Sequence, residues 1–217
     1  MLSQAQTIHL YAGGHPTDAE DLLVFLAANR SGLRRAGYGF FGFELQQTGR
    51  ESLEGLMPRQ TITDTDISTA AAAVAGRIAA DRRGGSTGFV LAVPELLGPA
   101  GDLLEGRFFT DSRTRAKAIR LALGQRVDRL VLAVQPYEVL LQAAWATAAM
   151  DRKILPFGAF AATLSTMAGV WVEAGLALTE ELGVGELIIQ LSRTSPQQSL
   201  GALVPGISLR QPIQPLP

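Results

Sequence analysis

The residues best suited to chemistry lie near the N-terminus, where a short apolar run leads into a loop rich in small and polar residues. Residues 7–30 predict a buried strand, a loop and a helix, and the loop carries Gly13, Gly14, His15 and Thr17. Glycines that lead into a helix N-terminus let backbone N–H groups approach a phosphate. The sequence satisfies neither the Walker pattern nor a dinucleotide fingerprint. An ordinary tight turn is therefore favoured over a ligand cradle.

Two ionisable side chains could act as acids or bases. His15 could serve as a base or proton sensor, although a solvated loop residue is the favoured interpretation. Glu95 follows a predicted strand and could be a general base or could hold a loop through N–H groups, and the neighbouring Pro94 favours a structural role. With Asp18 and Glu20 across the same crevice, an acidic cluster that binds Mg²⁺ or Ca²⁺ is a weaker alternative. We expect no metal site.

The composition excludes several classes of partner. Nineteen basic and 20 acidic residues give a net charge of −1, so no broad positive field attracts nucleic acid or an anionic membrane. The absence of cysteine excludes disulfides, thiolate metal sites and cysteine nucleophiles, and it fits the cytoplasm. Residues 1–7 do not resemble a signal peptide, and no apolar stretch reaches the roughly 18 residues of a membrane span. We expect a soluble cytoplasmic protein without nucleic-acid or membrane partners.

Short apolar runs alternate with helical patterns along the chain. The runs, mostly rich in Val, Leu and Ile without polar alternation, suit buried parallel strands and comprise residues 8–11, 88–93, 129–134 and 187–191. The helical patterns comprise residues 18–36, 66–82, 110–124, 137–151 and 169–182. This alternation predicts an α/β three-layer sandwich with a mostly parallel central sheet. No linker divides the chain, so residues 1–217 are expected to form a single domain.

Three further segments have two possible interpretations. Residues 38–43 hold four aromatic side chains beside glycines and could form a core strand or an exposed loop offered to a protein partner. The proline-bearing tail, residues 192–217, is expected to be partly extended and is a second candidate docking segment. The cluster of Arg113, Arg115 and Lys117 is expected on a solvated helix face, because no aromatic interleaving suggests nucleic-acid binding.

Four segments, in order, resemble the bacterial sulfotransferase-like proteins. The stretch IHLYAGGHPTDAEDLLVFLAANRSGLRRAGYGF is similar to that family's first strand, a loop of type H-x-G-x-H-K-T-G-T-T, and a helix ending L-x-x-N-R-x-x-L-x-x-x-G. The other segments are LAVPELLGPAGDLL, VDRLVLAVQPYEVLLQAAWATAA and GVWVEAGLALTEELGVGELIIQ. The resemblance covers roughly residues 7–191. It implies a P-loop-like α/β fold.

The family transfers a sulfuryl group from 3′-phosphoadenosine 5′-phosphosulfate (PAPS), and the loop residues that would hold this donor are changed here. His15 and Thr17 keep the family's residue types, whereas Pro16 replaces the lysine at the bridging oxygen and Asp18 replaces a glycine. Two hydroxyl residues are also replaced, one of them by Glu20. Proline removes a cation and a backbone N–H, and the added carboxylates repel a polyanion. The same acids suit a helix N-terminus.

The second half of the family's donor site is changed as well. An arginine at a strand end and a serine eight residues later hold the 3′-phosphate in the family, and Gln135 and Ala143 stand at these positions. A neutral amide and a methyl group do not replace a bidentate cation. Two separate parts of one ligand site are therefore lost together.

These changes predict a sulfotransferase-like pseudoenzyme that has lost PAPS binding and catalysis, takes no cofactor, and acts as a binding or interaction protein. Its degenerate donor site would comprise Gly13, Gly14, Thr17 and Gln135. The alternative is an active sulfotransferase, or another group transferase, with a rearranged donor site. PAPS would then be the cofactor, and His15 and Glu95 would be catalytic.

Overall fold

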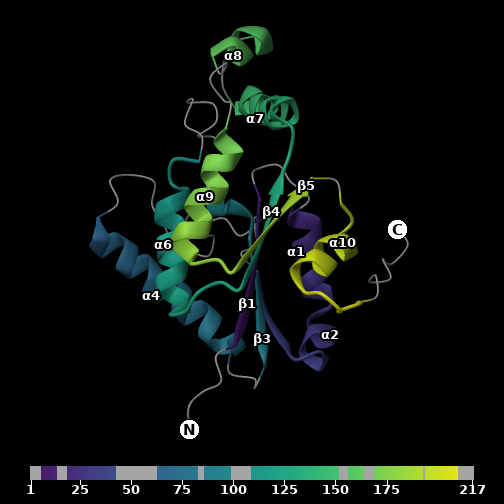
Figure 1. The fold of residues 1–217 in the computed structure, drawn as a ribbon. Coiled ribbons are helices and arrows are strands. Elements are labelled where there is room, and N and C mark those ends of the chain that lie inside the picture. Colours follow the sequence, from purple (N-terminus) through teal and green to yellow (C-terminus); the bar gives the residue numbers. More distant parts are fainter. Residues whose placement is uncertain are drawn as a thin grey trace.

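The strands of the protein form one parallel sheet in the order β2-β3-β1-β4-β5 (Figure 1). The computed structural model describes residues 6–13, 19–42, 63–82, 86–98, 109–151, 156–163, 169–192 and 194–209. The five strands are β1 (Thr7–Gly13), β2 (Tyr38–Gly42), β3 (Gly88–Val93), β4 (Arg129–Val134) and β5 (Glu186–Leu191). All four of their pairings are parallel. The predicted parallel sheet is confirmed.

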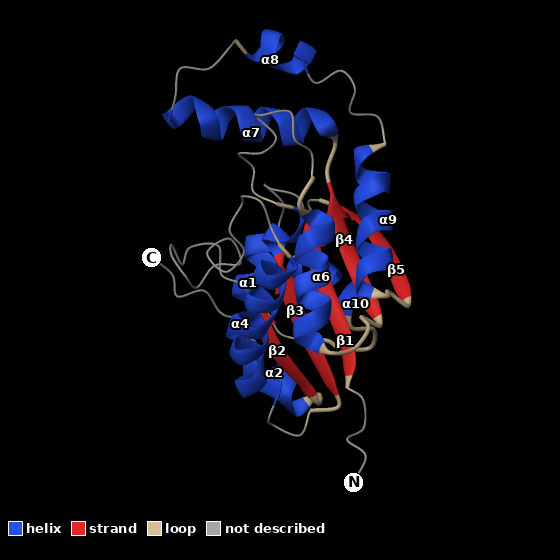
Figure 2. Ribbon diagram, turned by 90° about the vertical axis from the view of Figure 1, so that its left-hand side faces the viewer, coloured by secondary structure: helices blue, strands red, loops and turns tan. Residues whose placement is uncertain are grey.

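Helices cover both faces of this sheet, which gives the predicted three layers (Figure 2). One face carries α1 (Ala19–Ala28), α2 (Arg30–Arg35) and α10 (Pro196–Leu203). The opposite face carries α4 (Asp64–Arg82), α6 (Ser112–Leu123) and α9 (Val170–Leu182). A 3₁₀ helix, η1 (Pro94–Leu97), follows β3 directly, and α7 (Tyr137–Asp151) and α8 (Phe157–Thr163) extend beyond the carboxyl end of β4. No helix among these described elements is long and apolar enough to cross a membrane.

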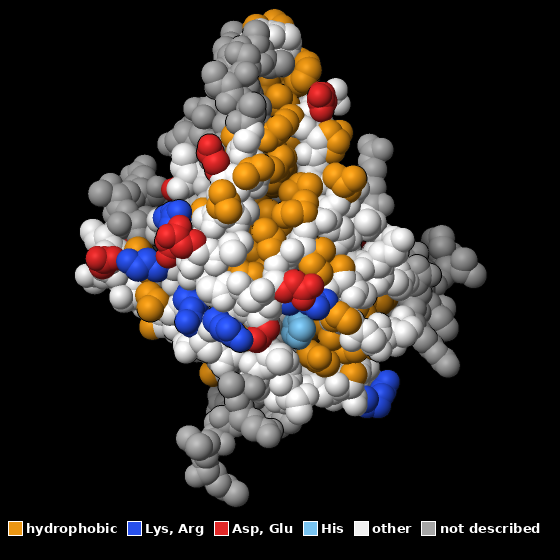
Figure 3. Space-filling model, in the orientation of Figure 1, with side chains coloured by type: hydrophobic (Ala, Val, Ile, Leu, Met, Phe, Trp, Pro, Cys, Tyr) orange, Lys and Arg blue, Asp and Glu red, His pale blue; other side chains and the backbone are white. Residues whose placement is uncertain are grey.

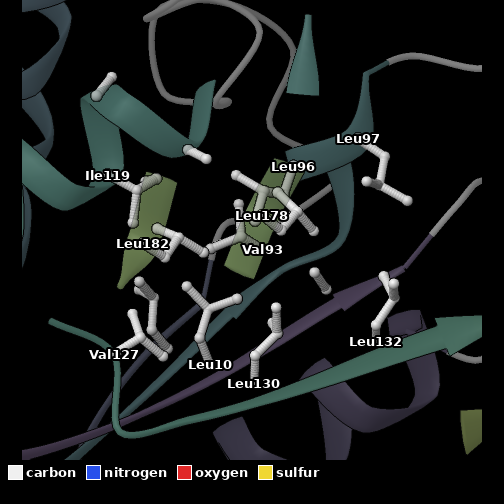
Figure 4. Packing of buried hydrophobic residues seen from close by; sticks show 14 of the residues in the cluster. Leu10, Val93, Leu96, Leu97, Ile119, Val127, Leu130, Leu132, Leu178 and Leu182 are labelled. Carbon is white, nitrogen blue, oxygen red and sulfur yellow. The ribbon is translucent and has the colours of Figure 1, made fainter. Parts of the chain in front are cut away.

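The central strands are apolar on both faces because both faces are covered. Along β1, Leu10 and Ala12 join the core beneath α6 and α9, while Tyr11 joins the core beneath α1 and α10. Figure 4 shows Leu10 and neighbouring strand residues packed against leucines of α9. Side chains with almost no exposed surface thus contribute to two separate cores. This explains why the strand sequences lack the polar alternation of a half-exposed sheet.

The aromatic segment 38–43 is a core strand and not an exposed docking loop. Tyr38–Gly42 is the edge strand β2, and the side chains of Phe40 and Phe41 are buried. Packing requires a glycine at the end of β2, because a Cβ on Gly42 would lie 2.5 Å from Leu23 Cδ2 of α1. The core-strand interpretation is therefore confirmed for the described residues, and a partner role of this segment stays a prediction. Phe43 lies outside them.

The predicted tail contains a helix that packs into the molecule. The side chain of Ser195 caps α10 by accepting a hydrogen bond from Gln198 N at 3.3 Å, while Ser195 N donates to Gln198 Oε1 at 2.9 Å. Pro196 occupies the first turn, where a missing N–H costs nothing. Leu200 and Leu203 are buried against the sheet. Helix α10 itself is thus part of the packed structure, and the docking role of the tail stays a prediction.

Helix ends follow local sequence signals in part. Thr63 and Asp66 form a reciprocal cap at the start of α4, with Asp66 N donating to Thr63 Oγ1 at 3.2 Å and Thr63 N donating to Asp66 Oδ2 at 2.9 Å. Gly124 closes α6 in the left-handed conformation, with φ at 67°. Asp111 stands at the N-cap position of α6, but its side chain makes no capping hydrogen bond. The predicted helix over residues 18–36 is divided at Asn29 into α1 and α2.

Candidate functional site

The order of the strands places a topological switch point at the carboxyl ends of β1 and β4, which is the position of the ligand crevice in open α/β sheets. The chain leaves β1 toward β2 at one side of the sheet and leaves β4 toward β5 at the other side. In open α/β sheets, ligands bind where neighbouring strands have connections that diverge in this way. In the register of the sheet, Gly13 lies opposite Ala133 of β4, and Ala12 lies opposite Val93 of β3. Three strands therefore end together at this edge.

The backbone of three predicted site residues reaches this edge. Gly13 is the last residue of β1 and is buried, Gln135 directly follows β4, and Glu95 belongs to η1, which packs beside β1. The Glu95 side chain lies outside the described part of the structure. Gly14, His15 and Thr17, the other predicted site residues, also lie outside it. The ends of β1, β3 and β4 thus converge at this edge, while the side chains of the predicted loop lie outside the described residues.

An aromatic cluster covers the end of β4, and we call it the aromatic cap: Phe109, Tyr137 and Trp171. Trp171 Nε1 donates a hydrogen bond to the carbonyl of Gln135 at 3.1 Å, and Trp171 N donates to the Tyr137 hydroxyl at 3.4 Å. The Trp171 ring lies 4.8 Å from that of Phe109 and 6.5 Å from that of Tyr137, centroid to centroid. Gln135 itself is only 3% exposed. Its neutral amide therefore belongs to the interior of the protein.

Phe109 holds a strained backbone at the edge of the aromatic cap. Its φ is 52°, in the left-handed region, which costs an L-residue about 1–2 kcal/mol. The ring is nevertheless buried against Trp171, and the Phe109 carbonyl accepts a hydrogen bond from Ser112 N at 3.0 Å, at the start of α6. Strain of this kind persists where surrounding contacts enforce it, and it gathers at functional sites. Sequence reasoning missed the aromatic cap because its members come from three separate segments.

The prediction of a solvated basic face on α6 is wrong for one residue. Arg113 pairs with Glu180 and Glu181 at 2.8 Å, and Lys117 pairs with Asp64 at 2.9 Å, all at the surface as predicted. Arg115 is 1% exposed. The helical period explains the difference, because Arg113 and Lys117 share a face while Arg115 projects from the opposite side.

Arg115 brings a positive charge to the same end of the sheet as the aromatic cap. Because α6 runs antiparallel to the strands it covers, its first turns lie at the carboxyl edge, where α6 contacts η1. A fully buried guanidinium requires polar or charged partners, since desolvation of a charge is costly. No group of three or more His, Asp or Glu residues gathers to hold a metal ion in the described part of the chain.

His9 lies in the amino half of β1, remote from the carboxyl edge of the sheet, and its ring is packed against the structure. The ring is 9% exposed and meets the Tyr38 ring edge-on at a centroid distance of 5.7 Å. Burial is the main cause that lowers the pKa of His9, and Arg129 lowers it further. A hydrogen bond with the Leu203 backbone opposes this shift of the pKa. His9 is therefore a neutral structural residue near neutral pH.

We predict that acid destabilises the protein through His9. Asp128 and Glu186 also face His9 and raise its pKa, but the net shift is downward. An unfolded histidine takes up a proton near pH 6.5, while the native one does so only at lower pH. The unfolded state then binds more protons, so stability is complete above about pH 6.5 and is lost as pH falls toward the lowered native pKa.

Urea unfolding between about pH 5.5 and pH 8 measures this effect. We expect the free energy of unfolding to fall on the acid side in the parent protein and to become flatter in His9→Gln, which keeps a hydrogen-bond donor. His15→Gln is the matched control, since His9 and His15 are the only histidines in the chain. An equal acid slope in the parent protein and His9→Gln would contradict the prediction.

Comparison with known proteins found no matching protein-family model and no matching curated protein. The fold and the site define the class: an α/β protein with an all-parallel five-stranded sheet and a topological switch point at its carboxyl edge. At that edge, the buried neutral Gln135 follows β4, and its carbonyl accepts a hydrogen bond from Trp171 of the aromatic cap. This arrangement can hold apolar or aromatic groups more readily than phosphate.

Proposed function

We propose that this chain is a sulfotransferase-like protein that does not bind PAPS and acts as a binding or interaction protein. The observation that carries the proposal is the burial of the neutral Gln135 at the end of β4, where its carbonyl accepts a hydrogen bond from Trp171. At this strand end the resemblance implies an arginine that holds the 3′-phosphate. The Gln135 side chain is neutral and 3% exposed, so a phosphate could reach it only if the packing of this strand end changed.

The energetics favour a phosphate-free crevice. A 3′-phosphate gains most from charge-assisted, bidentate hydrogen bonds, and Ala143 of α7, a half-buried methyl side chain, offers none. The carbonyl of Gln135 already accepts a hydrogen bond from Trp171. Because burying an anion without paired donors is strongly unfavourable, neither Gln135 nor Ala143 compensates the 3′-phosphate of the donor nucleotide.

A group transferase with a rearranged donor site is the second candidate, and the burial of Arg115 favours it. This guanidinium lies in the first turns of α6, at the edge where β1, β3 and β4 end. A buried cation at such an edge can serve an anionic substrate once loops close around it. His15 and Glu95 would then be the acid and base of the reaction.

Calorimetric titration with PAPS and with its bisphosphate product distinguishes the two candidates. We expect no binding heat for either nucleotide, with a PAPS-dependent sulfotransferase in the same buffer as positive control. A micromolar dissociation constant for either nucleotide would contradict the proposal. If that binding disappeared in Arg115→Gln and survived in Arg113→Gln, with both variants folded by circular dichroism, the rearranged transferase would take its place.

A further inference from the structure

A stripe of exposed apolar side chains crosses α9 and β5, and we call it the β5 stripe. Its members are 36–68% exposed and comprise Val172, Leu176, Leu187, Ile189 and Leu191. Figure 3 shows apolar side chains gathered along the middle of this face of the molecule. Single exposed apolar residues are ordinary, but a contiguous group marks an interaction surface. The β5 stripe therefore needs an occupant.

The backbone of β5 is open along the same edge. Glu186 N donates to Asp128 O at 2.9 Å and Ser192 N donates to Val134 O at 2.7 Å, so even-numbered residues of β5 turn their backbone groups toward β4. Residues 187, 189 and 191 consequently turn theirs outward, where β5 ends the sheet. The sequence ELIIQL contains no lysine or proline, and its register with β4 is continuous, without a bulge. Three common protections of an edge strand, lysine, proline and a bulge, are therefore missing from β5.

We propose that the occupant is a second copy of this chain, joined by antiparallel pairing of β5 with β5 about a two-fold axis at Ile189. This register places Leu187 of one copy opposite Leu191 of the other, and Ile189 opposite its own counterpart. The outward backbone groups of both copies are satisfied at once. Antiparallel pairing also closes after two copies, as a two-fold interface must, and leaves no β5 edge for a third copy.

The position of α9 fits the same axis. A Cβ on Gly175 would lie 3.6 Å from Leu132 Cδ2 of β4 and 3.8 Å from Leu187 Cδ2 of β5, so α9 lies over the line between these strands. Strands are spaced about 4.8 Å apart. The two copies of α9 would therefore lie about 10 Å apart on one face of the joined sheet, which is the distance of packed helices.

The side chains of α9 point to this seam. The buried Ala174 and Leu178 lie on the side of the helix that packs with α6. Gly175 faces the sheet between the two sides of α9. Val172 and Leu176 are one turn apart on the side away from α6, and they project past β5. Helix and strand thus present their exposed apolar residues to one axis, so the two-fold operation brings Leu176 of both copies to the same seam.

The chemistry of the β5 stripe favours a second copy over a charged partner. None of its five members carries a charge, so it offers no complementarity to a basic or acidic peptide. Its exposed parts amount to about three whole aliphatic side chains per copy. That is suited to the apolar core of a standard interface, which buries about 800 Å² per partner. This inference does not depend on whether the crevice binds PAPS.

Sedimentation and light scattering test the dimer in solution. We expect the parent protein to have twice the chain mass of 23.0 kDa, and Leu176→Glu and Ile189→Lys to weaken association at least ~100-fold, so that the mass halves. Val24→Glu is the matched control: Val24 is 68% exposed on α1, on the other face of the sheet, against 64% for Leu176. This control should remain a dimer.

A single cysteine tests the register directly, because the chain has no cysteine of its own. Residues that exchange both backbone hydrogen bonds across an antiparallel pair have Cα atoms about 5.5 Å apart, within the range of a disulfide. Ile189→Cys should therefore oxidise to a covalent dimer, and Val24→Cys should not. A parent protein that stays monomeric at every concentration, or a dimer that persists in both charged variants, would overturn the proposal.

Discussion

Replacing Gln135 by arginine is expected to lower the free energy of unfolding by about 3–5 kcal/mol and to create no binding of PAPS. The substitution restores the residue type that the sulfotransferase-like resemblance implies. It would place a guanidinium where the parent residue is 3% exposed. An uncompensated buried charge is among the most destabilising changes in a protein.

Urea unfolding and nucleotide titration of the same variant provide the measurement. Gln142→Arg is a matched control, because Gln142 is an exposed residue of α7, and its change should stay within about 0.5 kcal/mol. Gln135→Met keeps a side chain of similar length without a charge. We expect it to lower the free energy of unfolding by about 1–2 kcal/mol, which is less than the effect of Gln135→Arg. A stable Gln135→Arg that binds the bisphosphate would instead identify an open donor site.

Removing the ring of Trp171 is the second large effect. Trp171→Ala is expected to lower the free energy of unfolding by about 3–5 kcal/mol. The change deletes the contacts with Phe109 and Tyr137 and leaves the Gln135 carbonyl without its indole donor. Trp171→Phe keeps a ring and loses that hydrogen bond, so about 1 kcal/mol is expected from the lost bond.

A double-mutant cycle separates the aromatic cap from general loss of packing. Phe109→Ala and Trp171→Ala should be non-additive by about 0.5–1.5 kcal/mol, because their rings contact each other. Trp171→Ala combined with Leu121→Ala, an exposed residue of α6, should be additive. Strictly additive effects in both pairs would show that Phe109 and Trp171 do not act together. The contact with Trp171 would then no longer explain the strained backbone of Phe109.

Most strands could be predicted because their signal is local. Residues 88–93 and 129–134 match β3 and β4 at both ends, since continuous runs of Val and Leu bounded by turns are typical of strands buried on both faces. The strand β2 was left ambiguous, because aromatic residues beside glycines fit a core strand and an exposed loop equally well. Helix α10 was missed, although Ser195, Pro196 and Gln198 carry a capping signal, because later prolines suggested an extended tail.

The site was predicted in part. The convergence of Gly13 and Gln135 at one edge follows from two parallel strands that end together, and the register of β1 with β4 bears it out. The burial of Arg115 and the assembly of the aromatic cap were not predicted. Phe109, Tyr137 and Trp171 are far apart in the sequence, and each is compatible with several environments until α6, α7 and α9 are placed around β4.

By itself, the sequence determined the alternation of strands and helices, the absence of cysteine chemistry, and the neutral residues at positions where the resemblance implies a phosphate-binding cation. Only the tertiary structure decided the order of the strands, which aromatic rings cover Gln135, and that Leu176 and Ile189 face one open edge. The physical reason is the distance along the sequence over which each interaction acts. Propensity, capping and apolar periodicity act within a few residues, whereas burial depends on which distant surfaces meet.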